Sequence, residues 1–353
     1  MRRVILARHG LPDFPAETHL CLGHTDLSLG PLGKMQAALL AEELQALKLT
    51  SLFSSPLLRC CQTAEAFGQP FVMEKDFIEQ DMGSWDGLSF ETIKQRFPAL
   101  YQARGKNPLL VPDCAETLLQ VQARALSALQ RCTTACCGDF AIVAHASVIQ
   151  AILASVMRIP LSESWKVRLP YGAYAVLLWN DGFQVETVRK FPHPPMSPDL
   201  AGSLLAAADP GQKVEAHCRA VAKKAAEIAD ALPISLDRNA LVCAAILHDV
   251  ARTERNHASV GAEWMETIGY AKEAELIRQH HDLETEALDE AAVLYLSDKC
   301  IQEDRPISIK ERFESSAAHC ITAEAKDAHA RRYASAKALQ TKVNTLCGHL
   351  VIL

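Results

Sequence analysis

The sequence has no apolar stretch near the ~18 residues that a membrane-spanning helix needs. It has no basic excess either: the formal net charge is -6, and the basic residues are dispersed along the chain. That balance argues against a nucleic-acid-binding surface and a polybasic membrane patch. The apolar run Val4–Ala7 ends at Arg8, well short of the roughly 7–15 residues of a signal sequence. We therefore expect a cytoplasmic protein with neither nucleic acid nor membrane as a partner.

The sequence also lacks any Cys-x-x-Cys pair, although it contains twelve cysteines. Two adjacent pairs, Cys60-Cys61 and Cys136-Cys137, have a spacing that suits neither an ordinary disulfide nor a zinc site. Disulfide frameworks are typical of small secreted chains. We expect reduced and mostly buried thiols here.

With 353 residues and 49% hydrophobic content, the chain is long enough for two domains. Four prolines between residues 191 and 198 exclude a regular helix or central strand there. Short apolar runs alternate with helical stretches before this point, and Ala/Leu/Glu-rich helical spacing dominates after it. The pattern predicts an α/β domain over 1–191, a Pro-rich linker over 192–211 and an all-α domain over 212–353, which ends in a helix at about 323–346.

Short apolar runs in the first half predict a largely parallel sheet covered on both faces by helices. Val4–Ala7, Ser51–Ser54 and Phe140–Ala144 are each followed by a turn and a helix. Tyr174–Trp179 and Phe183–Val188 flank Asn180-Asp181-Gly182, which is a strong hairpin signal. We expect that hairpin to complete the sheet.

The residues just after three of these strands carry the chemistry, because ligand sites in open α/β sheets lie at the carboxyl ends of strands. Arg8-His9-Gly10 follows the first strand, and His145 follows the strand at 140–144. After the strand at 51–54, Ser55 is a natural N-cap and Pro56 a natural first helical residue, which places Arg59 in the first turn of a helix.

Two arginines and two histidines would thus converge on one sheet edge, and this set suits a phosphoryl group. An arginine fork matches phosphate oxygens and stays charged at physiological pH. A neutral imidazole can act as a nucleophile while a second one stabilises charge. Gly10 would let the backbone approach the anion.

These residues belong to a longer ordered series, from residue 1 to about 190, that resembles the histidine phosphatase (phosphoglycerate-mutase-like) superfamily. The series is Arg8-His9-Gly10, Gly23-His24-Thr25-Asp26, Ser55-Pro56-Leu57-x-Arg59-x-x-Gln62-Thr63-Ala64, Phe77-Ile78-Glu79, Gly83-x-Trp85-Asp86-Gly87, Glu116-Thr117 and Val143-Ala144-His145. The resemblance implies a three-layer phosphoglycerate-mutase-like fold and a phosphomonoesterase without a cofactor that acts on a small phosphorylated metabolite.

The resemblance also implies a role for five side chains. His9 would be the nucleophile that becomes phosphohistidine. Arg8, Arg59 and His145 would hold the phosphoryl oxygens and stabilise the charge that develops during transfer. Glu79 would protonate the leaving oxygen and then help water attack the phosphohistidine.

Three departures from the family pattern bear on the substrate rather than on phosphoryl chemistry. Leu11-Pro12 replaces the usual Glu-Thr, Ala146-Ser147 stands where small glycines are common, and Cys114-Ala115 replaces glycines. The short segment between Glu79 and Glu116 leaves little lid and favours a phosphatase over a mutase.

An ordered set of histidines and aspartates in the second half resembles the HD-domain metal-dependent phosphohydrolases. His217, His248-Asp249 and Asp298 match the four core ligands, and His257 and His280-His281 match the extra ligands of members with two metals. The resemblance implies an all-α HD-type domain over about 213–300 that hydrolyses a nucleotide or related phosphoester. Such ligands suit a divalent Mn, Fe, Ni, Co, Zn or Mg ion, which would activate water.

Two alternatives remain open beside a two-domain phosphohydrolase. The first half could be a phosphomutase, which retains the phosphohistidine and returns the phosphoryl group to substrate. Alternatively, the second half could be a non-catalytic metal- or nucleotide-binding sensor that regulates the phosphatase.

Overall fold

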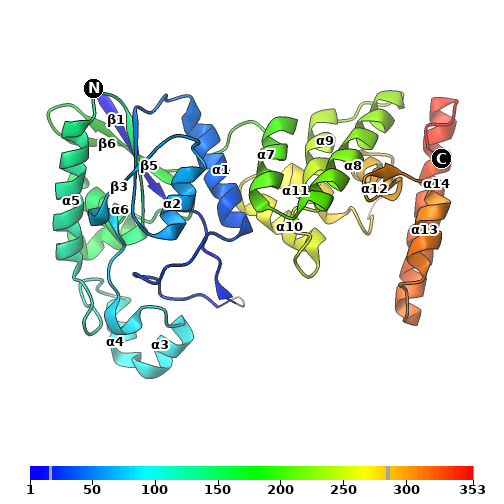
Figure 1. Cartoon of the computed structure of the whole chain (residues 1–353). Coiled ribbons are helices and arrows are strands. Elements are labelled where there is room, and N and C mark those ends of the chain that lie inside the picture. Colours follow the sequence, from blue (N-terminus) through cyan, green and yellow to red (C-terminus); the bar gives the residue numbers. More distant parts are fainter. Residues whose placement is uncertain (16–17, 284–286, 353) are drawn as a thin grey trace. The chain divides into compact units, whose positions relative to one another are not determined.

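The computed structural model describes residues 1–15, 18–283 and 287–352 of the chain. It contains two compact units, Met1–Pro194 and Pro195–Leu353, each of which is described by itself (Figure 1). Within the described residues, no helix is long and apolar enough to cross a membrane.

The first unit is built on a six-stranded sheet in the order β3-β2-β4-β1-β5-β6. Its strands are β1 (Arg2–Arg8), β2 (Ser51–Ser54), β3 (Val72–Met73), β4 (Phe140–Ala144), β5 (Tyr174–Trp179) and β6 (Phe183–Lys190). The first four strands along that order are parallel to one another, and β5 and β6 form the predicted antiparallel hairpin.

Alternate residues of β1 point to opposite faces of the sheet, as the strand period of two requires. Val4 and Leu6 belong to a buried cluster with α5 (Leu118–Ala135) and α6 (Ala146–Met157). Ile5 and Ala7 belong to the cluster on the other face, with α1 (Pro31–Gln45) and α2 (Leu58–Glu65). The three-layer α/β architecture is confirmed (Figure 1).

The register brings the carboxyl ends of three parallel strands to one edge. Arg8 of β1 pairs with Ala144 of β4, and Ser54 of β2 pairs with Val143. His9, Ser55 and His145 therefore follow their strands at the same edge of the sheet.

The start of α2 differs from the prediction. The helix begins at Leu58 after Leu57, and Ser55 does not cap it. The Leu58 N–H donates a hydrogen bond instead to the carboxylate of Asp26, at 2.7 Å. Because a side chain from a distant loop caps the helix, Ser55 is free for another partner, while Arg59 still lies in the first turn.

The segment between Glu79 and Glu116 contains more structure than the short lid that the sequence suggested. It includes α3 (Phe90–Arg96) and α4 (Pro98–Arg104), preceded by the short helices η2 (Lys75–Phe77) and η3 (Gly83–Trp85). Figure 1 shows α3 and α4 set apart from the sheet and its covering helices. They pack on a small core of their own that includes Trp85. A further short helix, η4 (Leu161–Lys166), follows α6.

The second unit is almost entirely helical, as predicted. Its helices are α7 (Pro198–Ala208), α8 (Gln212–Ala231), α9 (Arg238–Leu247), α10 (His257–Thr267), α11 (Ala271–Arg278), α12 (Glu290–Lys299), α13 (Ile309–Ala317) and α14 (Ala323–Cys347). A small hairpin, β7 (Ile301–Gln302) and β8 (Arg305–Pro306), follows α12. The helix α8 packs on α9 and α12, and α10 packs on α11. The predicted terminal helix is α14, which packs on α12 and α13.

The prediction that residues 192–211 contain no regular helix is wrong from Pro198 onward. Pro198 stands at the start of α7, where its missing N–H costs no helical hydrogen bond. The Ser197 hydroxyl caps the helix by accepting from the Leu200 N–H at 3.2 Å. Leu204 and Leu205 are buried, and α7 packs on α9. The Pro-rich stretch is therefore partly an element of the second unit.

The cysteines are free thiols, and seven of the twelve are buried. Burial raises the pKa of Cys132 and Cys243 to about 12, so both stay protonated and unreactive at neutral pH. The predicted burial of most of the cysteines is confirmed.

Candidate active site and metal centre

The sheet edge of the first unit opens into a cavity of about 280 Å³. Arg8, His9, Arg59 and Glu79 all line it. The structure thus brings together four of the predicted side chains, contributed by the ends of β1 and α2 and by the loop after η2.

His9 is 4% exposed, and its ring is held in one orientation. Its Nδ1 lies 2.7 Å from the carbonyl oxygen of Gly10. A carbonyl only accepts, so Nδ1 carries the proton and Nε2 keeps its lone pair. Burial and the charges of Arg59 and Arg8 lower the pKa of His9 well below its ordinary value. His9 is therefore a neutral imidazole with a nucleophilic Nε2.

The two arginines are oriented by backbone carbonyls. Arg8 Nη1 donates to Leu169 at 2.8 Å, and Arg59 donates to the carbonyls of Thr25 and Gly23, each at 2.9 Å. The Nε atoms of both arginines are buried and have no hydrogen-bond partner in the described part of the chain. Buried charged donors without acceptors are costly, so this cavity is suited to an anion.

His145 is fully buried beside His9, with ring centroids 5.1 Å apart, but it is not among the residues that line the cavity. Its Nε2 forms a 2.7 Å hydrogen bond with the hydroxyl of Ser55. Burial, with the charges of Arg59 and Arg8, lowers the pKa of His145 well below its ordinary value. The side chain behind His9 is thus a second neutral imidazole held by Ser55.

Glu79 is 7% exposed and lines the same cavity. One carboxylate oxygen accepts from the N–H of Gln80 at 2.8 Å, and the other accepts from the N–H of Ser147 at 3.4 Å. Two backbone donors therefore hold its carboxyl group at the cavity wall.

The predicted reason for a glycine at position 10 is wrong. A Cβ there would lie 2.2 Å from the carbonyl oxygen of Gly33, so Gly10 is required by the close approach of α1. Its N–H donates to the hydroxyl of Thr63 at 3.1 Å, and Gly10 does not line the cavity. Its carbonyl nevertheless fixes the His9 ring.

Two further residues, which the sequence analysis did not identify, contact the predicted site residues or the loop that carries them. Tyr171 lines the cavity, and its ring lies 3.8 Å from the Arg8 guanidinium carbon, a cation–π distance. Arg124 of α5 donates to the carbonyls of Ile78 and Glu79, at 2.7 and 3.1 Å, and forms a 2.7 Å ion pair with Glu116. The Glu116 motif therefore acts through Arg124 on the loop that carries Glu79.

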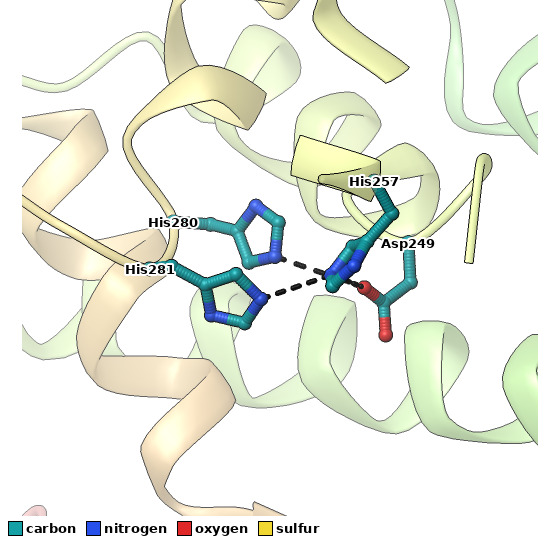
Figure 2. A group of neighbouring side chains, drawn as sticks. All are labelled: Asp249, His257, His280 and His281. Atoms are coloured by element: carbon teal, nitrogen blue, oxygen red, sulfur yellow. Dashed lines mark hydrogen bonds and ion pairs between the residues drawn. The ribbon is translucent and has the colours of Figure 1, made fainter. Parts of the chain in front are cut away.

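In the second unit, all seven predicted ligands lie in one region formed by α8, α9, α10, α12 and the residues after α11. Asp249, His257, His280 and His281 form one group whose ligand atoms lie within 4.8 Å of one another. His217 and His248 form a second group with the same Asp249. Figure 2 shows the three imidazoles and the carboxylate of the first group turned toward one another. A shared carboxylate between two groups is an arrangement that suits two neighbouring metal ions.

Three of the histidines present Nε2 to this region for the same reason as His9. The Nδ1 atoms of His217, His248 and His280 lie 2.7–2.8 Å from the carbonyl oxygens of Glu303, Ala245 and Ile277. Backbone carbonyls of this kind fix the tautomer of metal-binding histidines. Burial and the neighbouring imidazoles lower the pKa of His280 well below its ordinary value, which favours the neutral, metal-binding form.

Asp298 joins the second group at close range. Its Oδ1 lies 3.1 Å from His217 Nε2 and 3.8 Å from His248 Nε2. Its Oδ2 accepts from the ammonium of Lys299 at 2.7 Å. Burial opposes ionisation, but Lys299 and His217 still hold the pKa of Asp298 well below its ordinary value. Lys299 is a buried neighbour that sequence reasoning missed.

The residues present fit a divalent cation. Nε2 of His248 and Nε2 of His280 are buried and make no hydrogen bond to any described residue. Asp249 Oδ1, which lies beside them, is 3.0 Å from His257 Nε2. Two buried lone-pair atoms without a donor in one place are expensive unless a cation satisfies them. The nitrogen and oxygen donors suit the borderline and hard divalent ions rather than a thiolate-bound zinc.

Comparison with known proteins supports both parts of this description. Residues 4–190 match the model of the histidine phosphatase superfamily (branch 1), and residues 214–302 match that of the HD domain. Phosphoserine phosphatase 1 of Hydrogenobacter thermophilus is 29% identical over 184 residues, which cover 50% of this chain and 86% of that protein. Glucosyl-3-phosphoglycerate phosphatase of Mycolicibacterium vanbaalenii is 27% identical over 179 residues, which cover 47% and 79%.

Among solved structures, YhfR of Bacillus stearothermophilus has 27% sequence identity and a TM-score of 0.50, covering 53% of this chain and 96% of that one. These matches cover about half of the chain, and the HD match accounts for the region of the seven histidine and aspartate ligands. The chain therefore belongs to the histidine phosphatase superfamily (branch 1), with an HD domain in its second half.

Proposed function

We propose that the first unit is a phosphomonoesterase in which His9 Nε2 attacks phosphorus. The observation that carries the proposal is the free Nε2 of a neutral His9 in the cavity where the Nε donors of Arg8 and Arg59 lack acceptors. The arginines would bind the phosphoryl oxygens, and His145 would stabilise charge from behind His9. Small phosphorylated metabolites are the substrate class, because two relatives are named for such activities.

The reaction proceeds in two steps, transfer of the phosphoryl group to His9 and hydrolysis of the phosphohistidine. The Nε2 lone pair forms a bond to phosphorus as the bond to the alcohol oxygen breaks, and Glu79 supplies the proton that the leaving alkoxide needs. Water then attacks the phosphohistidine, its proton returns to Glu79, and inorganic phosphate leaves with His9 restored. The two backbone N–H groups on Glu79 hold the carboxyl group at the cavity wall for both steps.

A trapped phosphoenzyme tests this mechanism. Rapid acid-free quenching with a ³²P-labelled phosphomonoester is expected to label wild-type protein at His9 in a base-stable, acid-labile bond. Glu79→Gln is expected to slow both formation and hydrolysis of that bond, whereas His9→Gln gives no label. Label that survives in His9→Gln while Pi is still released would contradict the assignment of the nucleophile.

We further propose that the second unit is a metal-dependent hydrolase of a nucleotide or related phosphoester. His217, His248, Asp249 and Asp298 would hold one divalent ion, and His257, His280 and His281 would hold a second one with Asp249. When bound, the metal supplies Lewis-acid polarisation of the phosphoester and activation of water. The backbone carbonyls on Nδ1 keep the imidazoles oriented before the metal binds.

We also propose that the protein is located in the cytoplasm.

Metal content and activity separate this proposal from a purely regulatory second unit. Asp249→Ala is expected to lose metal, measured by elemental analysis, and to lose nucleotide hydrolysis, while phosphate release by His9 continues. A variant that loses metal and changes only the His9-dependent rate would instead favour the sensor.

Stimulation by a bisphosphate together with a transfer product would favour a phosphomutase in the first unit.

A further inference from the structure

A second cavity, of about 450 Å³, adjoins the one that contains His9. Trp85, Phe90 and Arg104 line both cavities, so the two cavities are adjacent. Pockets for organic ligands are typically ~300–1,000 Å³. The phosphate-binding cavity alone is at the small end of that range, and the second cavity adds room for a much larger alcohol part than that of a three-carbon phosphoester.

Aromatic rings form the walls of the second cavity. Phe90 of α3 is 40% exposed, and Phe90 and Tyr101 of α4 both line the cavity. Trp85 lines it as well, with its ring centroid 6.3 Å from that of Tyr101. An exposed phenylalanine and a tyrosine at a cavity wall offer faces on which a flat ring can stack.

Within the part of the chain that the structure describes, this cavity contains one donor without an acceptor and one guanidinium without a carboxylate partner. Trp85 is 2% exposed, and its indole N–H is buried without a hydrogen-bond partner among the described residues. Arg104 donates to Gln80 Oε1 at 3.3 Å and to the carbonyls of Pro108 and Leu110. Over the ranges 1–15, 18–283 and 287–352, no carboxylate lies within ion-pair distance of its guanidinium. Burial lowers the pKa of Arg104, which shows that its charge is poorly solvated.

We propose that this second cavity binds the alcohol part of the phosphomonoester and that this part carries a flat heteroaromatic ring rich in hydrogen-bond acceptors. The inference rests on the proposed function of His9. Phe90 and Tyr101 stack on the ring, while the Trp85 N–H and the Arg104 guanidinium supply the donors that its ring nitrogens or carbonyls need. An acyclic alcohol such as serine or glycerol leaves the Trp85 N–H without an acceptor and the aromatic faces without a ring to stack on.

The test compares substrates that share a ribose 5-phosphoester bond and differ in the ring attached to the sugar. In the full-length Asp249→Ala chain with EDTA, which silences the metal centre, kcat/KM is measured for adenosine and uridine 5′-monophosphates and for ribose 5-phosphate. At least one nucleotide is expected to exceed ribose 5-phosphate by about tenfold or more, the contribution of one base–aromatic stack. Phe90→Leu and Trp85→Phe are expected to remove most of that preference, measured as the ratio of the nucleotide kcat/KM to the ribose 5-phosphate kcat/KM in the same variant.

Trp165→Leu is the matched control, because Trp165 is a similarly exposed aromatic residue that lines neither cavity. It is expected to leave all three rates unchanged. Equal rates for ribose 5-phosphate and both nucleotides, or equal loss on all three substrates in Phe90→Leu, would overturn the ring subsite while His9-dependent hydrolysis stands. No His9-dependent hydrolysis of any substrate, p-nitrophenyl phosphate included, would instead overturn the proposed function and this inference with it.

Discussion

At the scale of single residues, both units use one device to set the chemistry of histidine. A backbone carbonyl accepts from Nδ1 of His9 in the first unit and of His217, His248 and His280 in the second. At His9, His248 and His280 the carbonyl fixes the proton on Nδ1 and leaves Nε2 as a lone pair, which serves as a nucleophile in one unit and as a ligand atom in the other. His217 Nε2 lies 3.1 Å from the Asp298 carboxylate and donates to it in this structure.

His9→Gln is expected to reduce metal-independent phosphate release by about 10³-fold or more, because glutamine offers no nucleophilic nitrogen. The control is His19→Gln, a partly exposed histidine of the same unit. Its rate is expected to stay near that of wild type in the same phosphate-release assay. A His9→Gln rate within a few-fold of wild type would contradict the role of His9.

The depressed pKa of His145 predicts acid sensitivity of the first unit. In the unfolded chain this imidazole binds a proton below about pH 6.5, whereas in the fold it stays neutral to a lower pH. The unfolded state then binds more protons, so stability falls as the pH drops below about 6.5. Lowering the pH from about 6.5 to 5.5 is expected to reduce the free energy of unfolding of both proteins, measured by denaturant titration. The reduction is expected to be smaller in His145→Gln than in wild type, by up to about 1.4 kcal/mol. An identical loss in both proteins would contradict the buried neutral state.

The sequence was sufficient to predict which side chains meet at the cavity but not what holds them. His9, Arg59 and Glu79 were recognisable because each belongs to a motif that follows a strand or begins a helix. Tyr171 and Ser55 were not assigned to the site, since their contacts with Arg8 and His145 join residues that are distant in sequence. Such contacts depend on packing, which a one-dimensional pattern does not carry.

At the scale of elements, α5 and the loop that bears Glu79 are joined by Arg124. Arg124 donates to the carbonyls of Asp76, Ile78 and Glu79 while pairing with Glu116. These bonds fix the backbone that carries the Glu79 carboxylate, although Arg124 itself does not line the cavity.

Arg124→Met is expected to lower kcat by about 10–100-fold through a misplaced Glu79, because small displacements of a reacting group have effects of this size. Arg131→Met is the matched control, since Arg131 also lies on α5 and pairs with Asp76 of the same loop but is half exposed. Exposed pairs contribute ~0–1 kcal/mol, so its steady-state kinetics should match wild type. Equal losses in both variants would count against a positioning role for Arg124.

Element boundaries were the part of the fold that local rules predicted least well. The start of α2 moved because Asp26 caps it from another loop, and α7 formed inside a Pro-rich stretch because Ser197 and Pro198 make a good helix start. In both cases the decisive partner or position depended on context, whereas the strand runs, which are buried on both faces, were readable directly.

At the scale of the whole molecule, the chain has two compact units with separate cores. Among the residues that the structure describes, the histidine and aspartate groups that suit a metal ion lie in the second unit. A ligand that binds the folded state alone stabilises it by about 3–4 kcal/mol at 100–1,000 times its Kd.

Metal removal is therefore expected to shift one of two thermal transitions. Calorimetry of the full chain should show a lower Tm for one transition in EDTA and an unchanged Tm for the other. The Asp249→Ala chain should already have the lower value and no further response to EDTA. If both transitions moved together in wild type, the stability of the two units would not be separable.

The most direct test of the central claim is phosphate release from a panel of phosphomonoesters and nucleotides, with and without EDTA, by wild type, His9→Gln and Asp249→Ala. The account predicts two substrate sets. One set survives EDTA and Asp249→Ala but is lost in His9→Gln, and the other is lost with EDTA and Asp249→Ala but survives in His9→Gln. Loss of every activity in EDTA would contradict the assignment of a metal-independent phosphohistidine mechanism to His9.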